Sequence, residues 1–480
     1  MRRTYLGIDC GTQSTKALLF DAEDGAELAT GRADHDLVST PDGAREQDPR
    51  WWVAAAEMAI RQALAGAPRV EVAGIGVSGQ QHGLVALDAA GVPVRPAKLW
   101  NDTSTISECD ALTARMGGEV AVHAATGNVF LAGYTAPKVE WLRVHEPAAY
   151  AAATGLCLPH DYLDLWLTGE FATEAGDASG TAYVDVRRRE YAPAVLAAID
   201  ANRDWDASLP PILASGAVLG TLRPAAAAAL GLPPGIPVST GGGDNMCAAI
   251  GVGAVEPGMA VMSLGTSGTV FGYSVAPAID PLREVSAFCD STGGWLPLAC
   301  VLNCALPLDW VRGLFGLDHA GFDALAMSAA PGAAGLAFVP YLDGERTPNR
   351  PAAAGEMLGL RATHGRAEIA RAVLEGVTAG LAHAVQAFER TGVTADEILL
   401  VGGAARSDGW GQILADWLGL PIVRPAVAEA AARGAAIHAA HVVGGAPLAR
   451  APVSGSRWTP GRSAATADTA TRYRDLLATR

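Results

Sequence analysis

The sequence from residue 235 to residue 245 reads Gly-Ile-Pro-Val-Ser-Thr-Gly-Gly-Gly-Asp-Asn, and the rest of the chain is organised around it. Its first half is apolar and predicts a strand, which three glycines then join to the carboxylate of Asp244. Glycine has no Cβ, so the backbone at 241–243 leaves room for a substrate and a phosphate beside that acid. The small residues at 246–251 predict the start of a helix. Open α/β sheets bind ligands at such a junction of strand, loop and helix, although a tight structural turn with an exposed Asp244 is the alternative.

The size and charge of the chain restrict the class of protein. Its 480 residues exceed an ordinary single core, which predicts two large domains, at residues 1–245 and 246–480. Half of the residues are hydrophobic and 18% are charged, as in a soluble, well-buried globular protein. The net charge of −15 argues against nucleic acid as a partner, because binding a phosphate backbone requires a basic surface. An anionic ligand such as a nucleotide must therefore be held by local donors and a metal ion.

Cysteine usage and hydropathy favour a cytoplasmic protein. The seven cysteines are odd in number and scattered, without Cys-x-x-Cys spacing, at positions 10, 109, 157, 247, 289, 300 and 304. They predict reduced thiols, mostly small core residues, in a reducing compartment. Asp9 interrupts any signal-peptide core, and the chain has no run of about 18 apolar residues that could span a membrane. We therefore expect a cytoplasmic location and no membrane partner, and the sequence leaves a homodimer open.

Two stretches of similar pattern predict β-hairpins that bind phosphate. Residues 4–20 contain two apolar runs around a turn rich in Gly, Thr and Ser, whose amides and hydroxyls suit an anion. Asp9 lies just ahead of the turn, which is expected when a divalent cation separates the acid from the phosphate. Lys16 either adds a positive charge at the phosphate or is an ordinary lysine on the face of the strand. Residues 258–272 repeat this pattern of strand, Gly-Thr-Ser turn and strand, which suggests an internal duplication. Two similar halves that hold a nucleotide between such hairpins resemble the actin-like, hexokinase-like ATPase folds.

A polar cluster between the hairpins is typical of a sugar site. The predicted strand 70–78 leads into Gly-Gln-Gln-His-Gly at 79–83, and we expect 84–88 to return as its hairpin partner. Polar side chains between glycines can hydrogen-bond a polyol, although an ordinary loop histidine is the alternative. Residues 98–102 read Lys-Leu-Trp-Asn-Asp and provide an aromatic ring, an amide and an acid, the groups that stack on and hydrogen-bond a sugar.

Other segments complete the expected alternation of helices, strands and loops. Helices are predicted within 107–150, over 158–169 with Gly169 as its end, and over 368–390. Polar or charged loops are predicted at 174–181 and at 339–348, and for the second a solvated surface loop is the alternative. A strand at 397–401 runs into a small-residue turn at 402–408, where a flat adenine could lie against backbone. The small residues of 428–437 are expected to close that pocket.

The order of these motifs resembles that of the FGGY carbohydrate kinases. Residues 9–16, 241–245 and 402–404 occur in the family's order, residues 133–142 approximate its first signature, and 355–360 with 368–375 fit the second. The stretches 78–83, 99–102, 177–181 and 340–348 resemble the members that phosphorylate D-xylulose in particular. The resemblance covers nearly the whole chain. It implies an α/β protein of two actin-like, ribonuclease H-like domains with a cleft between them, and ATP-dependent phosphorylation of a ketopentose.

By resemblance, individual residues acquire expected roles. Asp244 is the catalytic base, Asp9 is the second catalytic carboxylate, and both are expected near Mg²⁺. The residues expected at the sugar are Gln81, His82, Trp100, Asp102 and Asn245. The residues expected at ATP are Thr12, Gln13, Ser14, Gly265, Thr266, Gly402, Gly403 and Ser407.

The chain departs from the family pattern at three positions, and these show which part of the predicted site is less well determined. Gln81 stands where relatives often have Met, Ser104 where many carry Arg, and Ala404 replaces a third glycine. The first two lie at the sugar end, so the phosphate chemistry is better determined than the sugar. Ribulose, L-xylulose or glycerol are alternative acceptors. An actin- or chaperone-type ATPase and a catalytically silent sugar sensor are alternatives from other classes.

Overall fold

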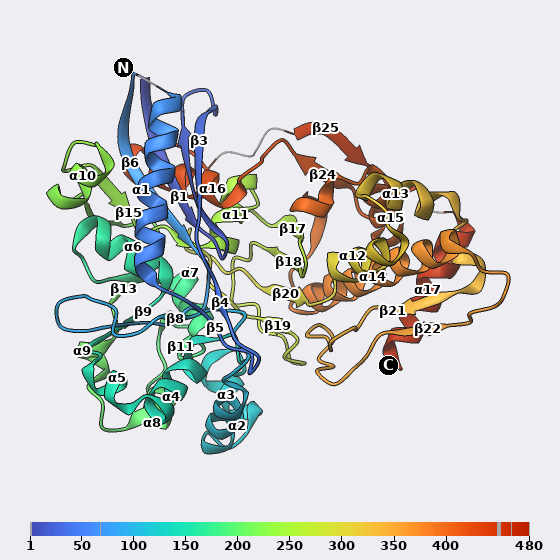
Figure 1. The fold of residues 1–480 in the computed structure, drawn as a ribbon, viewed down its shortest axis with the longest axis horizontal. Coiled ribbons are helices and arrows are strands. Elements are labelled where there is room, and N and C mark those ends of the chain that lie inside the picture. The colour runs from blue at the N-terminus through green and yellow to red at the C-terminus, as the bar shows by residue number, and fades with distance from the viewer. Residues whose placement is uncertain (1, 68, 449–452, 462, 480) are drawn as a thin grey trace.

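Two lobes, each built on a seven-stranded sheet, make up the computed structural model, which describes residues 2–67, 69–448, 453–461 and 463–479 (Figure 1). The first sheet has the order β14-β15-β6-β1-β2-β3, with β16 also paired to β6, and the second has the order β19-β20-β18-β17-β23-β24-β25. The strands of the first sheet are β1 (Arg2–Cys10), β2 (Ser14–Phe20), β3 (Glu27–Asp34), β6 (Val70–Gly79), β14 (Val218–Thr221), β15 (Pro237–Ser239) and β16 (Gly242–Gly243). Those of the second are β17 (Gly258–Leu264), β18 (Gly268–Gly272), β19 (Val285–Ser286), β20 (Leu298–Val301), β23 (Ala395–Val401), β24 (Ile422–Pro425) and β25 (Val453–Trp458).

The remaining strands form small separate sheets. They are β4 (Val38–Ser39), β5 (Arg45–Gln47) and β8 (Ala97–Lys98) in one sheet; β7 (Val85–Leu87) with β9 (Gly155–Cys157); β10 (Thr173–Glu174) with β13 (Ile212–Leu213); β11 (Val184–Asp185) with β12 (Glu190–Tyr191); and β21 (Ala337–Val339) with β22 (Glu356–Leu358).

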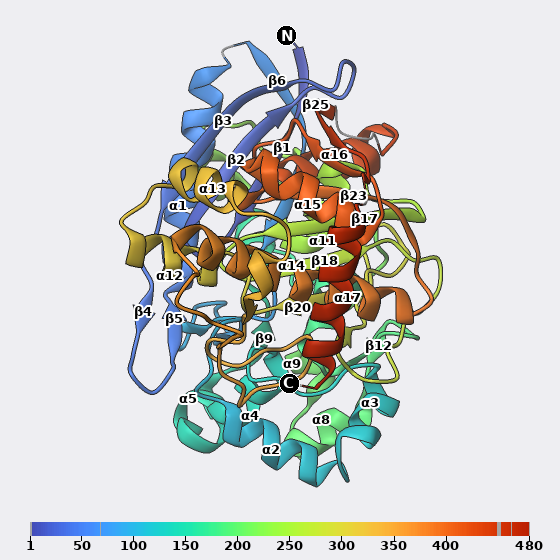
Figure 2. The same ribbon diagram turned by 90° about the vertical axis from the view of Figure 1, so that its right-hand side faces the viewer.

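Helices surround both sheets. Those before residue 253 are α1 (Pro49–Gly66), α2 (Ile106–Arg115), α3 (Glu119–Thr126), α4 (Thr135–His145), α5 (Pro147–Ala152), α6 (Pro159–Thr168), α7 (Ala175–Ala178), α8 (Pro193–Asp200), α9 (Trp205–Ser208), α10 (Pro224–Leu230) and α11 (Asp244–Val252), with the 3₁₀ helix η1 (Ser179–Thr181). The later ones are α12 (Ala305–Phe315), α13 (His319–Ser328), α14 (Arg366–Arg390), α15 (Asp408–Leu418), α16 (Ala430–Gly444) and α17 (Ala464–Ala478), with η2 (Ala333–Gly335) and η3 (Gly403–Arg406). The last helix, α17, packs on α14 and α15 along the outer side of the second lobe (Figure 2).

The two sheets repeat one pattern, as the paired hairpins predict. In each, a hairpin (β1–β2 or β17–β18) is extended by a third antiparallel strand (β3 or β20). On the other side, two parallel strands and an antiparallel edge strand follow, β6-β15-β14 in one sheet and β23-β24-β25 in the other. Both predicted hairpins are confirmed, and six strands of each sheet have the same order and directions.

Alternating side chains direct the two faces of the first sheet to different helices. Leu6 and Ile8 of β1 pack with α1 residues such as Trp52, whereas Tyr5 packs with the small residues of α16. This is the two-residue period of a strand buried on both faces. Figure 1 shows the consequence: α16, late in the chain, crosses back to the first lobe and lies beside β1 and β6.

Glycines make the crossing of α16 with α11 and with the sheet possible. A Cβ on Gly434 would lie 1.7 Å from the carbonyl oxygen of Cys247, and one on Gly251 would lie 1.9 Å from that of Ala430. Gly7 on β1 is equally close, because its Cβ would lie 1.9 Å from the carbonyl oxygen of Ala432. Small residues of the 428–437 segment serve this packing, and their expected role in closing an adenosine pocket stays a prediction. The domain boundary at residue 245 stays a prediction; that residue lies inside α11.

Two sequence expectations for local structure are wrong. Residues 84–88 do not pair with β6, because β1 and the β15–β16 segments already occupy both of its edges; β7 pairs with β9 instead. Residues 174–181, predicted as a polar loop, instead form a buried helical turn, α7 and η1, with Glu174 just before it. The Glu174 carboxylate accepts hydrogen bonds from the Gly176 and Asp177 amides, so this polar segment satisfies its own backbone.

Most other expectations for secondary structure are confirmed. The structure places helices at 159–168, with Gly169 in the left-handed region (φ 85°), and at 366–390, and it places the strand β23 and the turn η3 where the sequence predicts them. All seven cysteines are buried and unpaired, as expected of reduced core thiols. Among the described residues, no helix combines the length and the apolar character needed to cross a bilayer.

Candidate active site

The ends of three parallel strands bring the predicted catalytic carboxylates together. In the register of the first sheet, Asp9 on β1 lies opposite Ser78 on β6, and Ser78 lies opposite Gly242 on β16. Asp244 follows β16 directly as the first residue of α11. The site therefore forms where neighbouring parallel strands end at the same edge of a sheet.

Asp9 is buried between a hydroxyl and a lysine. Its Oδ1 accepts a hydrogen bond from Ser78 Oγ at 3.1 Å, and Lys16 Nζ lies 3.5 Å from its Oδ2. Lys16 also lies 2.9 Å from Glu429 Oε2, so its charge is shared between the two acids. Burial raises the pKa of Asp9 above its ordinary value, and the charge of Lys16 opposes that rise.

Asp244 is half-buried and carries a strongly shifted pKa. Burial raises the pKa of its carboxyl from 3.8 to about 7, and the charge of Asp9 acts in the same direction. The backbone N–H and the side-chain amide of Asn245 both donate to Asp244 Oδ1, at 2.8 and 3.0 Å, and partly offset the rise. A carboxyl with its pKa near neutrality is suited to exchange a proton with a substrate.

This shift predicts how the stability of the protein without metal depends on pH. A carboxyl whose pKa is raised in the folded state stabilises that state below its unfolded pKa and loses this contribution as pH rises through about 7. The Asp244→Asn variant cannot ionise, so we expect its melting temperature to exceed that of the wild type at pH 8 but not at pH 4. Thermal melts across this range in a chelating buffer measure the difference; curves that stay parallel from pH 4 to pH 8 contradict the assigned shift.

The glycine loop before Asp244 is packed against neighbouring backbone. Gly241 has φ +56°, and a Cβ there would lie 2.0 Å from the carbonyl oxygen of Val77. The preceding Thr240 carbonyl lies 2.8 Å from Nε2 of the buried His160. The glycines therefore allow the loop to lie directly on β6, which fixes where α11 starts.

A cavity of about 120 Å³ opens beside Asp244 and contains most of the predicted sugar residues. Of these, Gln81, His82, Trp100 and Asn245 line it together with Asp244. Asn245 Nδ2 donates to Gln81 Oε1 at 2.9 Å, which fixes the Gln81 amide next to the carboxylate. The other lining residues, which sequence reasoning did not assign to the site, are Tyr134, Ser267, Thr269, Ser286, Phe288, Leu298, Cys300 and Arg346.

His82 is held in place by its backbone and by two aromatic rings. Its backbone is left-handed (φ +67°), and its carbonyl accepts hydrogen bonds from Lys138 Nζ at 2.7 Å and Thr135 Oγ1 at 3.1 Å. The ring centroids of Tyr134 and Phe288 lie 4.6 and 5.6 Å from that of the imidazole. Burial, followed by the charges of Lys138 and Arg346, lowers the pKa of His82 well below its usual range, so the imidazole is neutral at physiological pH.

Asp102 differs from the other predicted sugar residues because it does not line this cavity. It is fully buried, and protein donors bind both of its carboxylate oxygens. Ser104 donates to Oδ1 from its N–H and its hydroxyl, at 2.9 and 2.6 Å, while the Arg45 N–H and Lys98 Nζ reach Oδ2 at 2.9 and 3.1 Å. In this structure Asp102 organises the loop around Trp100, and direct contact with a sugar stays a prediction.

The first predicted phosphate hairpin is linked to this cavity through Trp100. Trp100, which is 37% exposed, donates from Nε1 to Thr12 Oγ1 at 2.8 Å and so joins the sugar cluster to the hairpin turn. Gln13 is exposed and Ser14 is buried at the start of β2. The turn is thus tied to the cavity through Thr12.

The second hairpin lies next to the predicted adenosine turn. The carbonyl of Gly265 accepts a hydrogen bond from the Ala305 N–H at 3.0 Å, and that of Thr266 accepts one from the Cys304 N–H at 3.2 Å, which fixes the turn on the start of α12. Gly402 (φ +94°) packs on the same strand, since a Cβ there would lie 2.5 Å from the Leu264 carbonyl oxygen. A Cβ on Gly403 would meet open space, whereas the Ser407 hydroxyl caps α15 by accepting from the Trp410 N–H.

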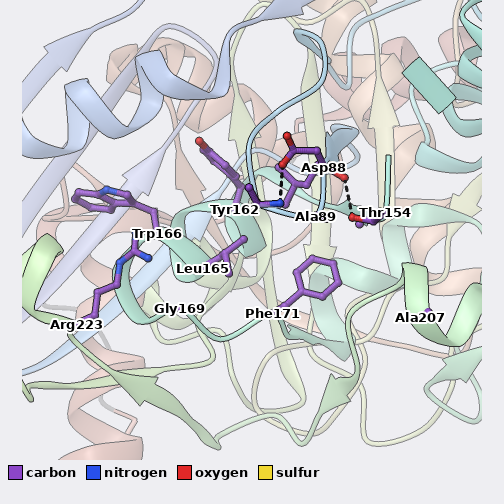
Figure 3. A pocket seen from close by; sticks show the side chains of 14 residues that line it. Asp88, Ala89, Thr154, Tyr162, Leu165, Trp166, Gly169, Phe171, Ala207 and Arg223 are labelled. Atoms are coloured by element: carbon purple, nitrogen blue, oxygen red, sulfur yellow. Dashed lines mark hydrogen bonds between the residues drawn. The ribbon is translucent and has the colours of Figure 1, made fainter. Parts of the chain in front are cut away.

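Another cavity, of about 490 Å³, lies in the first lobe and shares no lining residue with the sugar cavity (Figure 3). Its walls include the rings of Tyr162, Trp166 and Phe171, with Asp88 and Arg223 at its edge. The Asp88 carboxylate is occupied by the N–H groups of Ala90 and Val92. Larger volume alone does not indicate the site of chemistry, because Asp244, whose pKa is raised to about 7, lines the smaller cavity.

Known proteins match this chain along most of its length. A model described as the FGGY family of carbohydrate kinases, N-terminal domain, matches residues 4–251, and its C-terminal counterpart matches residues 260–443. The chain is 40% identical over 442 residues to a xylulose kinase from Haemophilus influenzae, covering 91% of this chain and 90% of that protein. It is 41% identical over 444 residues to a xylulose kinase from Streptomyces coelicolor, covering 92% and 88%. The crystal structure of a xyloylose kinase from Brucella ovis superposes with a TM-score of 0.93 at 33% identity and covers 99% of both chains.

Proposed function

Because the chain belongs to the FGGY family of carbohydrate kinases, we propose that it transfers the γ-phosphoryl group of ATP to the terminal hydroxyl of D-xylulose, giving D-xylulose 5-phosphate. The expected fold class, two actin-like α/β domains, is confirmed by the likeness to solved kinases of this family. The protein is a carbohydrate kinase, and its relatives support D-xylulose as the acceptor. The observation that carries the proposal furthest is the cavity that joins Asp244 to a polar sugar cluster.

Asp244 has the position and the pKa expected of a general base. In phosphoryl transfer the protein mainly positions the reactants and offsets charge. In our proposal the Asp244 carboxylate accepts the proton of the sugar hydroxyl while that oxygen bonds to the γ-phosphorus and the bond from the γ-phosphorus to the ADP oxygen breaks. The Gln81–Asn245–Asp244 chain of hydrogen bonds holds the carboxylate toward the cavity. Closure of the lobes would exclude water, which competes as an acceptor.

The carboxylates of Asp9 and Asp244 suit Mg²⁺. Magnesium takes oxygen ligands, and proteins hold it with one or two carboxylates plus waters and substrate phosphates. The part of the chain that the structure describes contains no cluster of three or more His, Cys, Asp or Glu side chains that could hold a metal. Bound between Asp9 and Asp244, Mg²⁺ would offset charge on the phosphate oxygens of ATP. The Gly11–Ser14 and Gly265–Ser267 turns would provide amide and hydroxyl donors for the phosphates.

An acceptor panel tests the proposed function. In a coupled assay near neutral pH we expect ADP release to require an acceptor. Of D-xylulose, ribulose, L-xylulose and glycerol, D-xylulose should give the fastest release. Faster turnover with another acceptor would reassign the sugar within the family. Release of ADP that is independent of any sugar would instead support an actin- or chaperone-type ATPase.

His82 provides a further prediction about the sugar site. We expect His82→Ala to raise the KM for D-xylulose about tenfold, because it removes a hydrogen-bonding imidazole from the cavity wall, and to leave the KM for ATP nearly unchanged. Steady-state kinetics with each substrate varied in turn measure the split. His319→Ala, at an exposed position on α13, is the matched control. An equal rise in both KM values would contradict the assignment of His82 to the sugar site.

A further inference from the structure

The segment Pro340–Pro348 is not the solvated loop that its charges and prolines suggest. Tyr341, Glu345 and Thr347 in it are at most 2% exposed. It follows β21 of the second lobe, and the cavity residue Arg346 lies within it. The segment therefore adds a charged side chain of the second lobe to a cavity whose predicted sugar residues lie before residue 246.

Glu345 holds the backbone of this segment firmly. Its carboxylate accepts hydrogen bonds from the N–H groups of Leu302, Asn303 and Arg346, at 2.5, 3.3 and 2.8 Å, and from Asn303 Nδ2 at 3.0 Å. Asn303 in turn donates to the Gly344 carbonyl at 2.8 Å. A buried carboxylate with four donors is a rigid anchor, so the position of Arg346 is determined before any ligand binds.

The guanidinium of Arg346 lacks a charged partner. It lies 5.6 Å from the ring centroid of Tyr134 and beside the Cys300 thiol, and the charge of Glu345 acts on it, but no salt bridge to it is found in the described parts of the chain. A guanidinium has five donors, and leaving donors unmatched inside a cavity is costly, so a ligand with suitable acceptors is expected there.

The charge of Arg346 acts at the end of the cavity away from the base. After burial and Lys138, Arg346 is the next influence that lowers the pKa of His82. After burial, the charge of Asp9 dominates the pKa of Asp244, and Lys16 is the cation that opposes it. The Arg346 guanidinium lies 5.6 Å from the ring centroid of Tyr134, and that centroid lies 4.6 Å from the centroid of His82, so Arg346 is at the His82–Tyr134 wall and the hydroxyl to be phosphorylated belongs at Asp244.

We propose that Arg346 binds two adjacent oxygens of the ketose, the C2 carbonyl and the C1 hydroxyl, at the end of the sugar remote from Asp244. This inference rests on the proposed function. The planar fork of a guanidinium matches two neighbouring oxygens, which a lysine ammonium does not. The carbonyl accepts hydrogen bonds only, so a group that only donates favours a ketose over the polyol in which that oxygen is a hydroxyl. Arg346 is then a specificity-determining residue, and its contact joins the second lobe to the bound sugar.

Kinetics of Arg346→Met test the contact. We expect the KM for D-xylulose to rise about 10- to 100-fold, as for loss of a charged hydrogen-bond donor, with the KM for ATP and the melting temperature nearly unchanged. Arg350→Met, at an exposed arginine of the same loop, is the matched control and should behave as the wild type. A fall in kcat with an unchanged KM for the sugar would place the guanidinium at the phosphoryl group and overturn the proposal.

Comparison of acceptors identifies the oxygens. The ratio of kcat/KM for D-xylulose to that for xylitol, and the ratio for D-xylulose to 1-deoxy-D-xylulose, should both fall toward one in Arg346→Met. Arg346→Lys should recover part of the KM but not the ratios. Ratios that stay at wild-type values overturn the inference while D-xylulose kinase activity stands. A wild-type protein that does not phosphorylate D-xylulose refutes the proposed function itself, and with it this assignment.

Discussion

Replacing Asp244 with alanine is expected to lower kcat for sugar phosphorylation by about 10²–10⁴-fold, the usual contribution of a general base. The carboxyl lies at the sugar cavity, and burial together with Asp9 raises its pKa to about 7, so a substantial fraction is ionised and able to take a proton at neutral pH. Asp244→Asn keeps the shape of the side chain and should lose a similar factor. Steady-state ADP release with D-xylulose, together with equilibrium binding of ATP, measures the loss of chemistry separately from the loss of binding.

The nucleotide should still bind to both variants, because the predicted adenosine turn at 402–403 follows β23 in the other lobe. Asp110→Ala, at an exposed acid on α2, controls for a general effect of removing a carboxylate. Near-normal turnover in Asp244→Ala would end the assignment of the base. Loss of ATP binding in parallel with turnover would make Asp244 a nucleotide or metal residue instead.

Gly434→Val is expected to prevent α16 from packing on α11. Even a Cβ at this position would lie 1.7 Å from the carbonyl oxygen of Cys247 and 2.8 Å from the N atom of Gly251, both of them backbone atoms that cannot rotate away. Overpacking of this kind costs about 1–3 kcal/mol or more, and a branched side chain is at the upper end. Because α11 begins at Asp244, separation of the two helices should also displace the base. We therefore expect a lower melting temperature and a lower kcat in the same protein.

Thermal melts and kinetics at a temperature where the variant is folded measure these two effects. Gly313→Ala in α12 is the matched control: it is also a helical glycine, but no atom lies within 4 Å of a Cβ there. It should be neutral or slightly stabilising, since alanine favours a helix over glycine. A Gly434→Val protein with wild-type stability would mean that α16 and α11 can move apart at no cost in stability. The packing of α16 would then not determine the position of Asp244.

Much of the site was accessible from the sequence, and the reason lies in local patterns. Asp9 and Asp244 each stand at a strand end within two residues of a glycine, and such a junction is encoded by a few consecutive residues. The segments around Gln81, His82 and Trp100 were recognisable for the same reason. Tyr134 and Lys138 lie in the first family signature, 133–142, so a signal for them existed; Phe288 lies in a short apolar run and had none.

Asp102 and Arg346 show where local patterns are insufficient. The Trp-Asn-Asp motif suggested a sugar ligand, but Lys98, Ser104 and the Arg45 backbone occupy the Asp102 carboxylate in the folded chain. Arg346 looked like a charge in a surface loop, and only the anchor at Glu345 brings it to the cavity. Whether a polar side chain is free or already paired depends on neighbours distant in sequence.

By itself the sequence determined the two hairpins, the strand-to-helix junction at Asp244, the order of the motifs and hence the kinase family, because each depends on side-chain alternation and glycine placement within short segments. The tertiary structure alone decided that β7 pairs with β9, that α16 returns to the first sheet, and that Arg346 and Phe288 join the sugar cavity. These outcomes depend on which strand edges are already occupied and on how closely glycines let helices approach, and both are properties of the assembled chain.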